Sequence, residues 1–530
     1  MIISEHLPEI LVAFAVVVFF HLRRLANKRN QQQDTNIVPE IPGALPLVGH
    51  LHLLRGNQIL ARKLASFADK YGAVFTVRLG ANNPTVVVSD YDDVKDCFTT
   101  HDRILAFRPD SSHAKILGYN YAGIGFAPYG TYLREIRKLL TTQLLSVHRI
   151  KALAHVQISE IHFLIADLYQ QSTGGGGNDD KATNVVVIGE VVQSTVINII
   201  TRMIAGKRYG YYDKESSGQG RPIGQVLSDI VVLTGTLVPS DSIPILGWLG
   251  LFQGAVKDMK RVSKEMDAIM ETWIDEHKDE RKKKKNKVDA NPDLIHMMLS
   301  EFKDQLFHGH QRENVIKATI LSVVVAGTDT TWITVTWILS NLLNHKSVLR
   351  LAQEEIDNKV GKDRWADESD IQNLTYLRAV IKETMRMYPV GPLSVPRKAS
   401  EDFVIGGSRR VPKGTWFMAN FWKLHRDPRL WSDPDEYKPE RFLNADANRE
   451  VFGQQFEYLP FGSGRRGCPG INFGMQMTEL VLARLLQGFD WTTPGDKPVD
   501  MSEVSGITLP KAIPLEVVLN PRLSPQLYTK

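Results

Sequence analysis

The chain has 530 residues, of which 43% are hydrophobic and 23% charged, and this balance excludes a disordered chain. Its formal net charge of +5 is small for the length and gives no indication of nucleic-acid binding. The two cysteines, Cys97 and Cys468, exclude a disulfide framework and fit a reducing compartment.

The N-terminus carries an apolar segment, uninterrupted from Ile10 to Phe20. Acidic residues precede it, and basic residues follow it at positions 23, 24, 28 and 29. A cleaved signal peptide would have a basic start and a small-residue cleavage site, and neither is present. We therefore predict that residues 1–22 form an uncleaved transmembrane signal anchor. The positive-inside rule places the remaining chain in the cytosol.

Residues 23–49 are predicted to be a linker followed by a proline-rich hinge. The hinge has the sequence Pro39-Glu-Ile-Pro-Gly-Ala-Leu-Pro46, and proline makes such a segment semi-rigid because it fixes φ. The alternative is a turn-rich entry to the domain. Residues 50–530 are predicted to form one folded domain.

Within this domain, the β-branched runs Val74–Arg78 and Pro84–Val88 predict a hairpin. Apolar periodicity predicts helices that alternate with short strands. The expected helices are 131–145, 184–203, 225–234, 252–277, 314–344, 376–387 and 471–487, and the expected later strands are 403–405, 416–419 and 515–519. The fold class is therefore mainly α with small β-sheets.

The helix expected at 314–344 contains Ala326-Gly-Thr-Asp-Thr-Thr331. Glycine inside a helix costs about 1 kcal/mol relative to alanine, and threonine hydroxyls can bond back to carbonyls and bend the helix. Asp329 in so apolar a helix requires a partner, water or a function. The simplest alternative is a kinked core helix.

Two segments place opposite charges together. Glu383 and Arg386 are three residues apart on one helix face, and Lys438-Pro-Glu-Arg-Phe442 offers a second arginine, Arg441. On an exposed helix, Glu383 and Arg386 would form a solvated pair worth a few tenths of a kcal/mol, but this helix is apolar.

The segment Phe461-Gly-Ser-Gly-Arg-Arg-Gly-Cys-Pro-Gly470 is a tight loop directly before the helix expected at 471–487. We expect the N-terminus of that helix to favour a thiolate at Cys468. One thiolate cannot build a structural zinc site, but it can be the axial ligand of a haem. The alternative is a buried, inert cysteine.

The spacing Phe461-x-x-Gly464-x-Arg466-x-Cys468-x-Gly470 resembles the haem-binding loop of plant microsomal cytochrome P450 enzymes. The resemblance implies the cytochrome P450 fold and haem b (iron protoporphyrin IX) with Cys468 as axial iron ligand. It also implies that Phe461 and Gly464 belong to the haem-binding set. Residues 326–331 resemble the oxygen-activation helix of this family, in which Thr330 and Asp329 would be the catalytic residues that handle protons.

The resemblance further implies that Arg137, Arg397 and Arg466 hold the haem propionates, because the guanidinium fork suits carboxylates. One residue departs from the pattern, since Leu133 stands where the family usually has tryptophan. Glu383, Arg386 and Arg441 are similar to the family's structural charge network. A lone histidine, His425, is more simply explained as structural than as a ligand.

The implied activity is insertion of one oxygen atom from O2 into an apolar plant metabolite such as a terpenoid, flavonoid or alkaloid. Electrons would come from NADPH through cytochrome P450 reductase at the endoplasmic reticulum membrane, with the catalytic domain in the cytosol. Two alternatives remain open at this stage. They are an oxygen-independent haem-thiolate isomerase or dehydratase, and a membrane-tethered haem electron-transfer protein.

Overall fold

A computed structural model describes residues 36–529 apart from 57, 82, 175–184, 210–220, 244–252, 284–291 and 303–304. The predicted signal anchor, residues 1–22, and the first part of the linker lie outside the described residues. The predictions for these segments therefore remain predictions.

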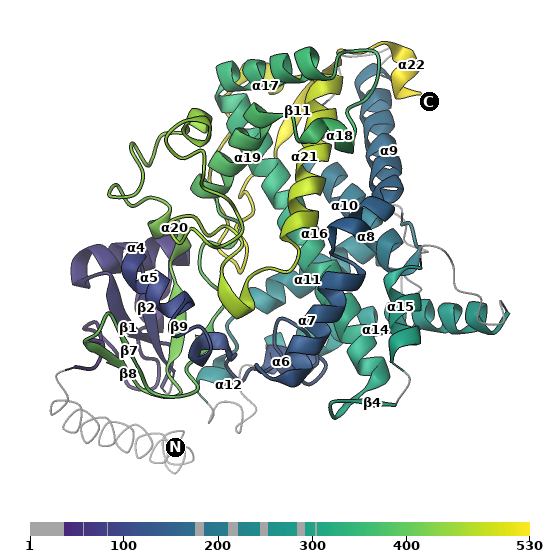
Figure 1. Ribbon diagram of the computed structural model, residues 1–530. Helices are drawn as coiled ribbons and strands as arrows, with labels where there is room; N and C mark the ends of the chain where they lie inside the picture. The colour runs from purple at the N-terminus through teal and green to yellow at the C-terminus, as the bar shows by residue number, and fades with distance from the viewer. Residues whose placement is uncertain are drawn as a thin grey trace, which may run out of the picture.

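The chain is mainly helical, as expected, and its helices gather on one side of a smaller β-rich part (Figure 1). The longer helices are α4 (Leu60–Tyr71), α5 (Tyr91–Phe98), α7 (Thr131–Gln143), α9 (Ala154–Thr173), α10 (Ile188–Ala205), α11 (Ile223–Gly235), α14 (Gly254–Lys283), α15 (Leu294–Glu301), α16 (Arg312–Asn344), α17 (Lys346–Lys359), α19 (Thr375–Met387) and α21 (Ile471–Gly488). The short helices are α3 (Leu51–Leu54), α6 (Ser112–Ile116), α8 (Val147–Ala152), α12 (Pro239–Ser242), α18 (Glu368–Ile371), α20 (Phe421–Leu424) and α22 (Pro525–Tyr528).

The largest sheet has the strand order β1 (Val74–Arg78), β2 (Pro84–Val88), β9 (Trp416–Ala419) and β6 (Arg397–Lys398). The β1–β2 hairpin has the predicted bounds, and β2 pairs in parallel with β9. A second sheet has the order β10 (Phe489–Thr492), β11 (Glu516–Pro521) and β3 (Val185–Val187). The remaining strands form two small hairpins, β4 (Leu306–Phe307) with β5 (His310–Gln311) and β7 (Phe403–Ile405) with β8 (Arg409–Val411).

Two predicted helix boundaries were wrong. Helix α14 continues past its predicted end at 277 to Lys283, and the start predicted at 184 also differs. The chain from 185 to 187 forms strand β3 against β11, and helix α10 begins only at Ile188. Three consecutive valines favour an extended backbone because branching at Cβ restricts their side chains in a helix. This strand fastens the start of α10 to the C-terminal sheet.

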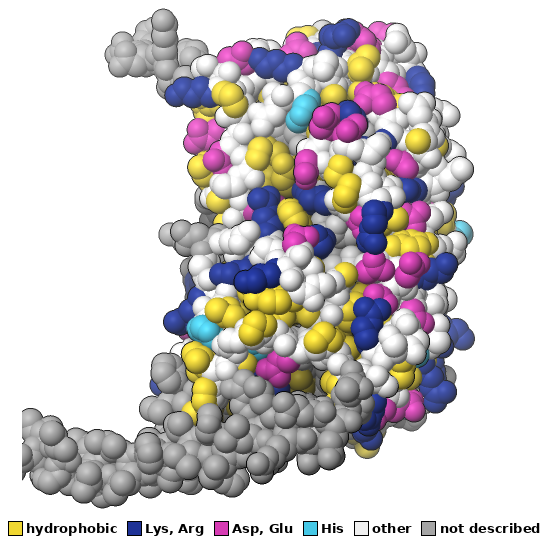
Figure 2. All heavy atoms as spheres, turned by 90° about the vertical axis from the view of Figure 1, so that its left-hand side faces the viewer, with side chains coloured by type: hydrophobic (Ala, Val, Ile, Leu, Met, Phe, Trp, Pro, Cys, Tyr) yellow, Lys and Arg dark blue, Asp and Glu magenta, His cyan; other side chains and the backbone are white. Residues whose placement is uncertain are grey.

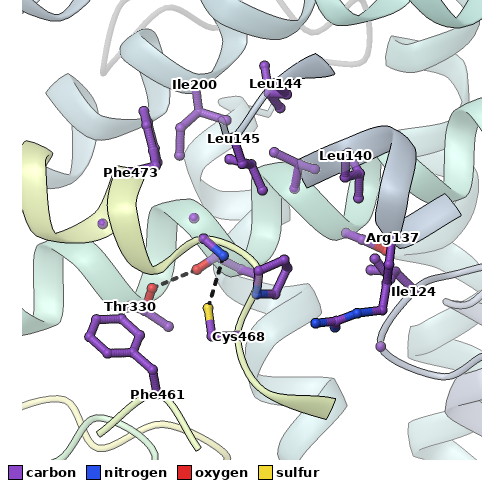
Figure 3. Close-up of a pocket in the computed structure, with 18 of the residues that line it drawn as sticks. Ile124, Arg137, Leu140, Leu144, Leu145, Ile200, Thr330, Phe461, Cys468 and Phe473 are labelled. Atoms are coloured by element: carbon purple, nitrogen blue, oxygen red, sulfur yellow. Dashed lines mark hydrogen bonds between the residues drawn. The ribbon is translucent and has the colours of Figure 1, made fainter. Parts of the chain in front are cut away.

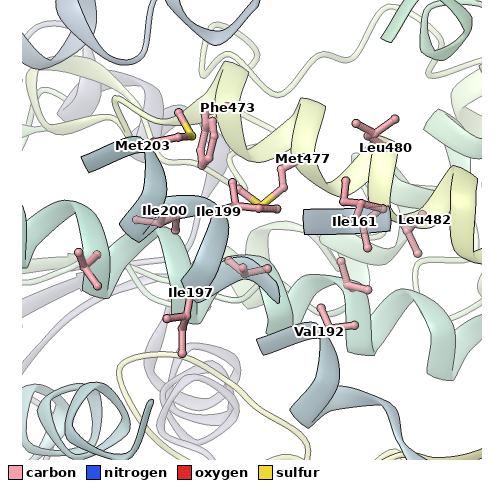
Figure 4. Packing of buried hydrophobic residues seen from close by; sticks show 14 of the residues in the cluster. Ile161, Val192, Ile197, Ile199, Ile200, Met203, Phe473, Met477, Leu480 and Leu482 are labelled. Atoms are coloured by element: carbon pink, nitrogen blue, oxygen red, sulfur yellow. The ribbon is translucent and has the colours of Figure 1, made fainter. Parts of the chain in front are cut away.

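Helix α16 lies in the middle of the helical part, between α10 and α21 (Figure 1). Its apolar length would also suit a membrane span, but most of its side chains from Thr331 to Leu343 are buried in the protein. Isoleucine and leucine side chains of α9, α10 and α21 interdigitate in the core beside it (Figure 4). This packing gives the central helices a fixed spacing.

The sheet-rich face of the molecule mixes charges of both signs with scattered apolar side chains (Figure 2). Neither positively nor negatively charged side chains dominate the described part of this face. This mixture is consistent with the small net charge.

The predicted charge network is present and buried. Glu383 accepts hydrogen bonds from Arg386 Nε at 2.8 Å and from Arg441 Nε at 3.1 Å. Glu383 and Arg386 are both fully buried. Arg386 also donates to the carbonyl of His425 at 2.8 Å. The network therefore joins α19 to the segment before the cysteine loop.

His425 is structural, as the sequence suggested. Its Nε2 accepts the backbone N–H of Leu459 at 2.9 Å, two residues before Phe461. Burial, followed by the nearby Arg386 charge, lowers the pKa of His425 to about 3, so the imidazole is neutral. A neutral acceptor fixes the start of the cysteine loop.

Candidate active site

The cysteine loop bends back on itself and presents one sulfur. The backbone N–H of Cys468 donates to the carbonyl of Phe461 at 3.0 Å, and the N–H of Gly470 donates to Cys468 Sγ at 3.3 Å. Gly462 and Gly464 have φ angles of +67° and +70°, a region that favours glycine. Helix α21 begins at Ile471, directly behind the sulfur.

Two cavities share this sulfur in their walls, and Figure 3 shows the lining of the first. Both are walled by Cys468 and Phe461 from the loop and by Ala326, Thr330 and Thr331 from α16. The rest of the first cavity wall is largely apolar and includes Leu140, Leu144, Leu145, Ile200, Met203, Ile204 and Phe473. Cys468 is accessible because it forms part of this internal wall.

Four arginine side chains surround the cavities, namely Arg108, Arg137, Arg397 and Arg466. Arg108 and Arg466 line both cavities, Arg137 the first and Arg397 the second. The sequence predicted three of them. It missed Arg108, which lies in the loop just before helix α6.

Three of these arginines have no carboxylate partner among the described residues. Arg137 donates to the carbonyl of Gly467 at 2.8 Å, Arg108 to that of Pro396 at 2.8 Å and Arg466 to that of Ala106 at 2.6 Å. Burial, followed by the charges of Arg397 and Arg137, lowers the pKa of Arg466 to about 9. Burial likewise lowers the pKa of Arg108 and of Arg137. Such uncompensated buried charge is costly unless an anion binds beside it.

Arg397 differs because it has a buried acidic partner, Asp102. Arg397 Nη1 lies 3.2 Å from Asp102 Oδ1, and each residue is only 3% exposed. The other oxygen of Asp102 accepts the backbone N–H of Arg465 at 3.0 Å and its side chain at 2.8 Å. Asp102 therefore ties the cysteine loop to strand β6, a role that the sequence did not reveal.

Gly464 does not line either cavity. A Cβ atom at this position would lie 2.2 Å from Asp102 Oδ1. Glycine is therefore needed so that the loop backbone can approach Asp102.

Helix α16 runs through the motif 326–331 and remains α-helical. Thr330 and Thr331 bond back to the carbonyls of Ala326 at 2.7 Å and Gly327 at 2.8 Å, as expected. Thr328 makes no such bond, since its buried hydroxyl has no partner. A Cβ at Gly327 would lie 2.8 Å from Ile200 Cδ1, so glycine here allows α10 to pack closely.

Thr330 and Asp329 point in different directions. Thr330 lies on the wall of both cavities, whereas Asp329 is on neither. The Asp329 carboxylate accepts a hydrogen bond from Thr508 Oγ1 at 2.8 Å. Burial raises the pKa of this carboxyl group, although the Thr508 bond opposes the shift.

The structure also shows the surroundings of Cys468 and Leu133. Burial raises the pKa of the Cys468 thiol, and the effects of the Gly470 N–H and the Arg137 charge are smaller. The N–H of Gly470 and the charge of Arg137 favour the thiolate, as expected, and a coordinated metal would favour it further. Leu133 is a core residue, 1% exposed, and does not line either cavity.

The donor set fits a haem. A single sulfur can be an axial iron ligand, and the apolar walls suit a porphyrin ring. The unpaired charges of Arg108, Arg137 and Arg466 supply the partners that two propionate groups require. The other cysteine, Cys97, is buried in the core under the large sheet and does not line either cavity.

Comparison with known proteins agrees with this geometry. The family model for cytochrome P450 matches residues 39–515. Dimethylnonatriene synthase of Arabidopsis thaliana is 44% identical over 520 residues, or 98% of both chains, and vinorine hydroxylase of Rauvolfia serpentina is 45% identical over 492 residues, or 92% of both. A zebra fish cytochrome P450 solved with progesterone matches with a TM-score of 0.72 and 26% identity, covering 88% of this chain and all of that one. The chain is therefore a member of the cytochrome P450 family, the haem-dependent monooxygenases.

Proposed function

We propose that this cytochrome P450 inserts one oxygen atom from O2 into an apolar plant metabolite of the terpenoid, flavonoid or alkaloid kind. The observation that carries the proposal is that Cys468 Sγ and the Thr330 hydroxyl face the same largely apolar cavity. An apolar wall of this kind holds a hydrophobic substrate and excludes bulk water. The relative named for hydroxylation of vinorine supports a plant metabolite as substrate.

In this proposal Cys468 would ligate the haem iron, and Arg108, Arg137, Arg397 and Arg466 would hold the propionates. Haem b supplies O2 binding and activation when it is bound there. Arg397 shares its charge with Asp102, so the remaining three arginines carry most of the propionate binding.

Thr330 is proposed to hold a proton donor at the cavity wall. Its hydroxyl donates to the Ala326 carbonyl at 2.7 Å, which leaves its oxygen lone pairs free to accept from a water molecule. Asp329 lies behind the wall with a raised pKa, so it can be protonated more readily than an exposed carboxylate. Thr508 fixes the position of Asp329.

Electrons are proposed to come from NADPH through cytochrome P450 reductase, which would dock on the face formed by Arg134, Lys138 and Arg465. Arg134 and Arg465 lie over the same ring, each guanidinium carbon 5.9 Å from the centre of Tyr129. Lys138 is exposed one helical turn further along α7. Charge on such a face mainly raises the rate of encounter with an acidic partner.

A charge-reversal experiment tests this docking face. The double variant Arg134→Glu, Lys138→Glu should slow reductase-driven turnover at low salt and leave peroxide-driven turnover near normal. Equal loss by both routes would show damage to the haem site instead.

The location is proposed to be the endoplasmic reticulum membrane, with residues 1–22 as a single-pass anchor and 50–530 as a cytosolic catalytic domain. The apolar side chains of Leu45 and Val48 in the proline-rich hinge are 49% and 36% exposed. They would add contact with the lipid surface beside the anchor. Deleting residues 1–22 should release much of the protein from membranes with its haem retained.

The function is tested by incubating plant extracts with the enzyme, reductase and NADPH, and recording O2 uptake and new masses. A product heavier by one oxygen atom, formed with NADPH-dependent O2 uptake, is the expected result. A product formed without O2 would indicate the isomerase or dehydratase alternative. No product would indicate an electron-transfer protein.

In the variant Thr330→Ala, we expect reducing equivalents from NADPH to be diverted to peroxide.

A further inference from the structure

A cluster of two histidines and one aspartate lies outside the active site. His277 is on α14, and Asp293 and His296 begin α15. His277 is 4% exposed, and one possible ligand atom from each of the three residues lies within 4.8 Å of the others. None of the three lines the cavities at Cys468.

The hydrogen bonds of His277 fix its tautomer. Its Nδ1 lies 2.6 Å from the carbonyl oxygen of Trp273, which can only accept, so Nδ1 carries a hydrogen. In the neutral ring, Nε2 is then a bare lone pair. This Nε2 lies 2.8 Å from Asp293 Oδ2, a carboxylate oxygen.

Two lone pairs at this separation repel each other unless a cation lies between them. A proton on Nε2 satisfies this need, and so does a metal ion bound to both atoms. The metal-bound arrangement matches the usual pattern, in which a histidine ligand donates its other ring N–H to a backbone carbonyl.

His296 supplies a third ligand from the same short segment as Asp293. Its Nδ1 lies 3.0 Å from Asp293 Oδ1, and its Nε2 lies 3.9 Å from Glu280 Oε2, which is three residues after His277 on α14. Asp293 Oδ1 also accepts the backbone N–H of His296 at 2.9 Å, so the carboxylate is held at the helix start.

We propose that His277, Asp293 and His296 bind a divalent transition-metal ion of the zinc class, with Glu280 or water in the fourth position. Two imidazoles and a carboxylate are a donor set that zinc prefers, and three protein ligands leave one position open. Zinc–ligand distances of about 2.0–2.2 Å put neighbouring ligand atoms about 3.4 Å apart. The observed separations, from 2.8 Å upward and within 4.8 Å, bracket this value.

The ion would join the C-terminal half of α14 to the first turn of α15. Both helices belong to the helical part that packs around α16. Because only the folded chain brings the three ligands together, zinc binding should stabilise the fold.

The test uses the full-length haem-loaded protein, prepared without a polyhistidine tag and stripped with a chelator. Zinc(II) chloride is titrated in against a fluorescent zinc indicator, and the zinc-to-haem ratio is measured after dialysis. Wild type should retain about one zinc ion per chain and unfold at a higher temperature with zinc than without it.

His296→Ala and His277→Ala should each lower zinc affinity by a factor of about 10 or more. His155→Ala is the matched control, since His155 is exposed and bonds only to the carbonyl of Ala152 on its own turn. His277 is buried, whereas His296 is partly exposed, so His296→Ala decides the test if His277→Ala does not fold. Zinc uptake that is absent in wild type, or equal in His296→Ala and wild type, would overturn the proposal and leave a proton as the bridging cation.

Discussion

The molecule contains two sets of buried arginines that differ in their partners. In the structural network, Arg386 and Arg441 share the buried carboxylate of Glu383. At the cavities, Arg108, Arg137 and Arg466 bond only to main-chain carbonyls among the described contacts. A buried charge with its own counter-charge holds the fold together, whereas a buried charge without one needs a ligand.

The largest effect should come from removing the shared carboxylate of the structural network. Glu383→Ala leaves two guanidinium groups buried and unpaired, and it should cost about 3–5 kcal/mol of unfolding free energy. Urea unfolding of the purified protein measures this loss, and the yield of folded protein should also fall.

Glu354→Ala is the matched control for this variant. Glu354 pairs with Arg350 at 2.6 Å, but both side chains are about half exposed or more. Such a surface pair contributes about 0–1 kcal/mol. Equal losses in the two variants would show that burial of the network does not matter.

Replacing a cavity arginine with a neutral residue should lower haem affinity without lowering the stability of the apoprotein. Arg137→Leu removes one partner of a propionate, and the loss of a charged hydrogen bond of about 1.5–3 kcal/mol weakens haem binding about 10- to 100-fold. The apoprotein should be as stable as wild type or more so, because one unpaired charge has gone. Haem transfer to apomyoglobin measures the affinity. A destabilised apoprotein with unchanged haem affinity would place Arg137 with the structural set.

Replacing Asp102 should have an intermediate effect, because its buried carboxylate pairs with one of the cavity arginines, Arg397. Asp102→Asn keeps the shape but removes the charge that Arg397 and Arg465 share, and it should cost about 1–3 kcal/mol of unfolding free energy. The control is Asp110→Asn, because Asp110 is 75% exposed and bonds to Lys398 at the surface. Unchanged stability in Asp102→Asn would mean that the loop is held by its backbone contacts alone.

The smallest effect concerns pH. Because the pKa of His425 is about 3 in the folded chain and 6.5 is its ordinary value, the unfolded chain binds a proton that the folded chain excludes. Stability should therefore fall as pH drops below about 6.5, by about 1.4 kcal/mol per unit from this group. The dependence of the unfolding free energy on pH between 6.5 and 5 should be less steep in His425→Asn by that amount. An identical slope would show that His425 is protonated in the folded protein.

The sequence predicted most of the fold because its helices are long and periodic. Helix α16 was expected at 314–344 and spans Arg312–Asn344. Its long apolar run far exceeds the length of a strand and therefore favours a helix. Strand β3 was missed because three valines at a helix start give no local sign of their partner strand, β11.

The sequence predicted only those residues of the candidate site that belong to a recognisable motif. Cys468 and Thr330 were expected, and the structure brings both to one cavity wall. Arg108 and Asp102 were missed because neither lies in a periodic helix or strand pattern. Their partners are about 300 residues away in the sequence. Asp329 was expected beside Thr330, but successive residues of a helix point in different directions, and its carboxylate faces Thr508.

The central claim is that Cys468 provides the axial thiolate at the point where the unpaired arginines converge. The most direct measurement is the absorption spectrum of the reduced carbon monoxide complex in Cys468→Ala, with Cys97→Ala as control because Cys97 is the other cysteine and is buried in the core under the sheet. We predict that Cys468→Ala loses the thiolate-type Soret shift and that Cys97→Ala keeps it. A thiolate-type Soret band that survives in Cys468→Ala would contradict the assignment of the haem ligand.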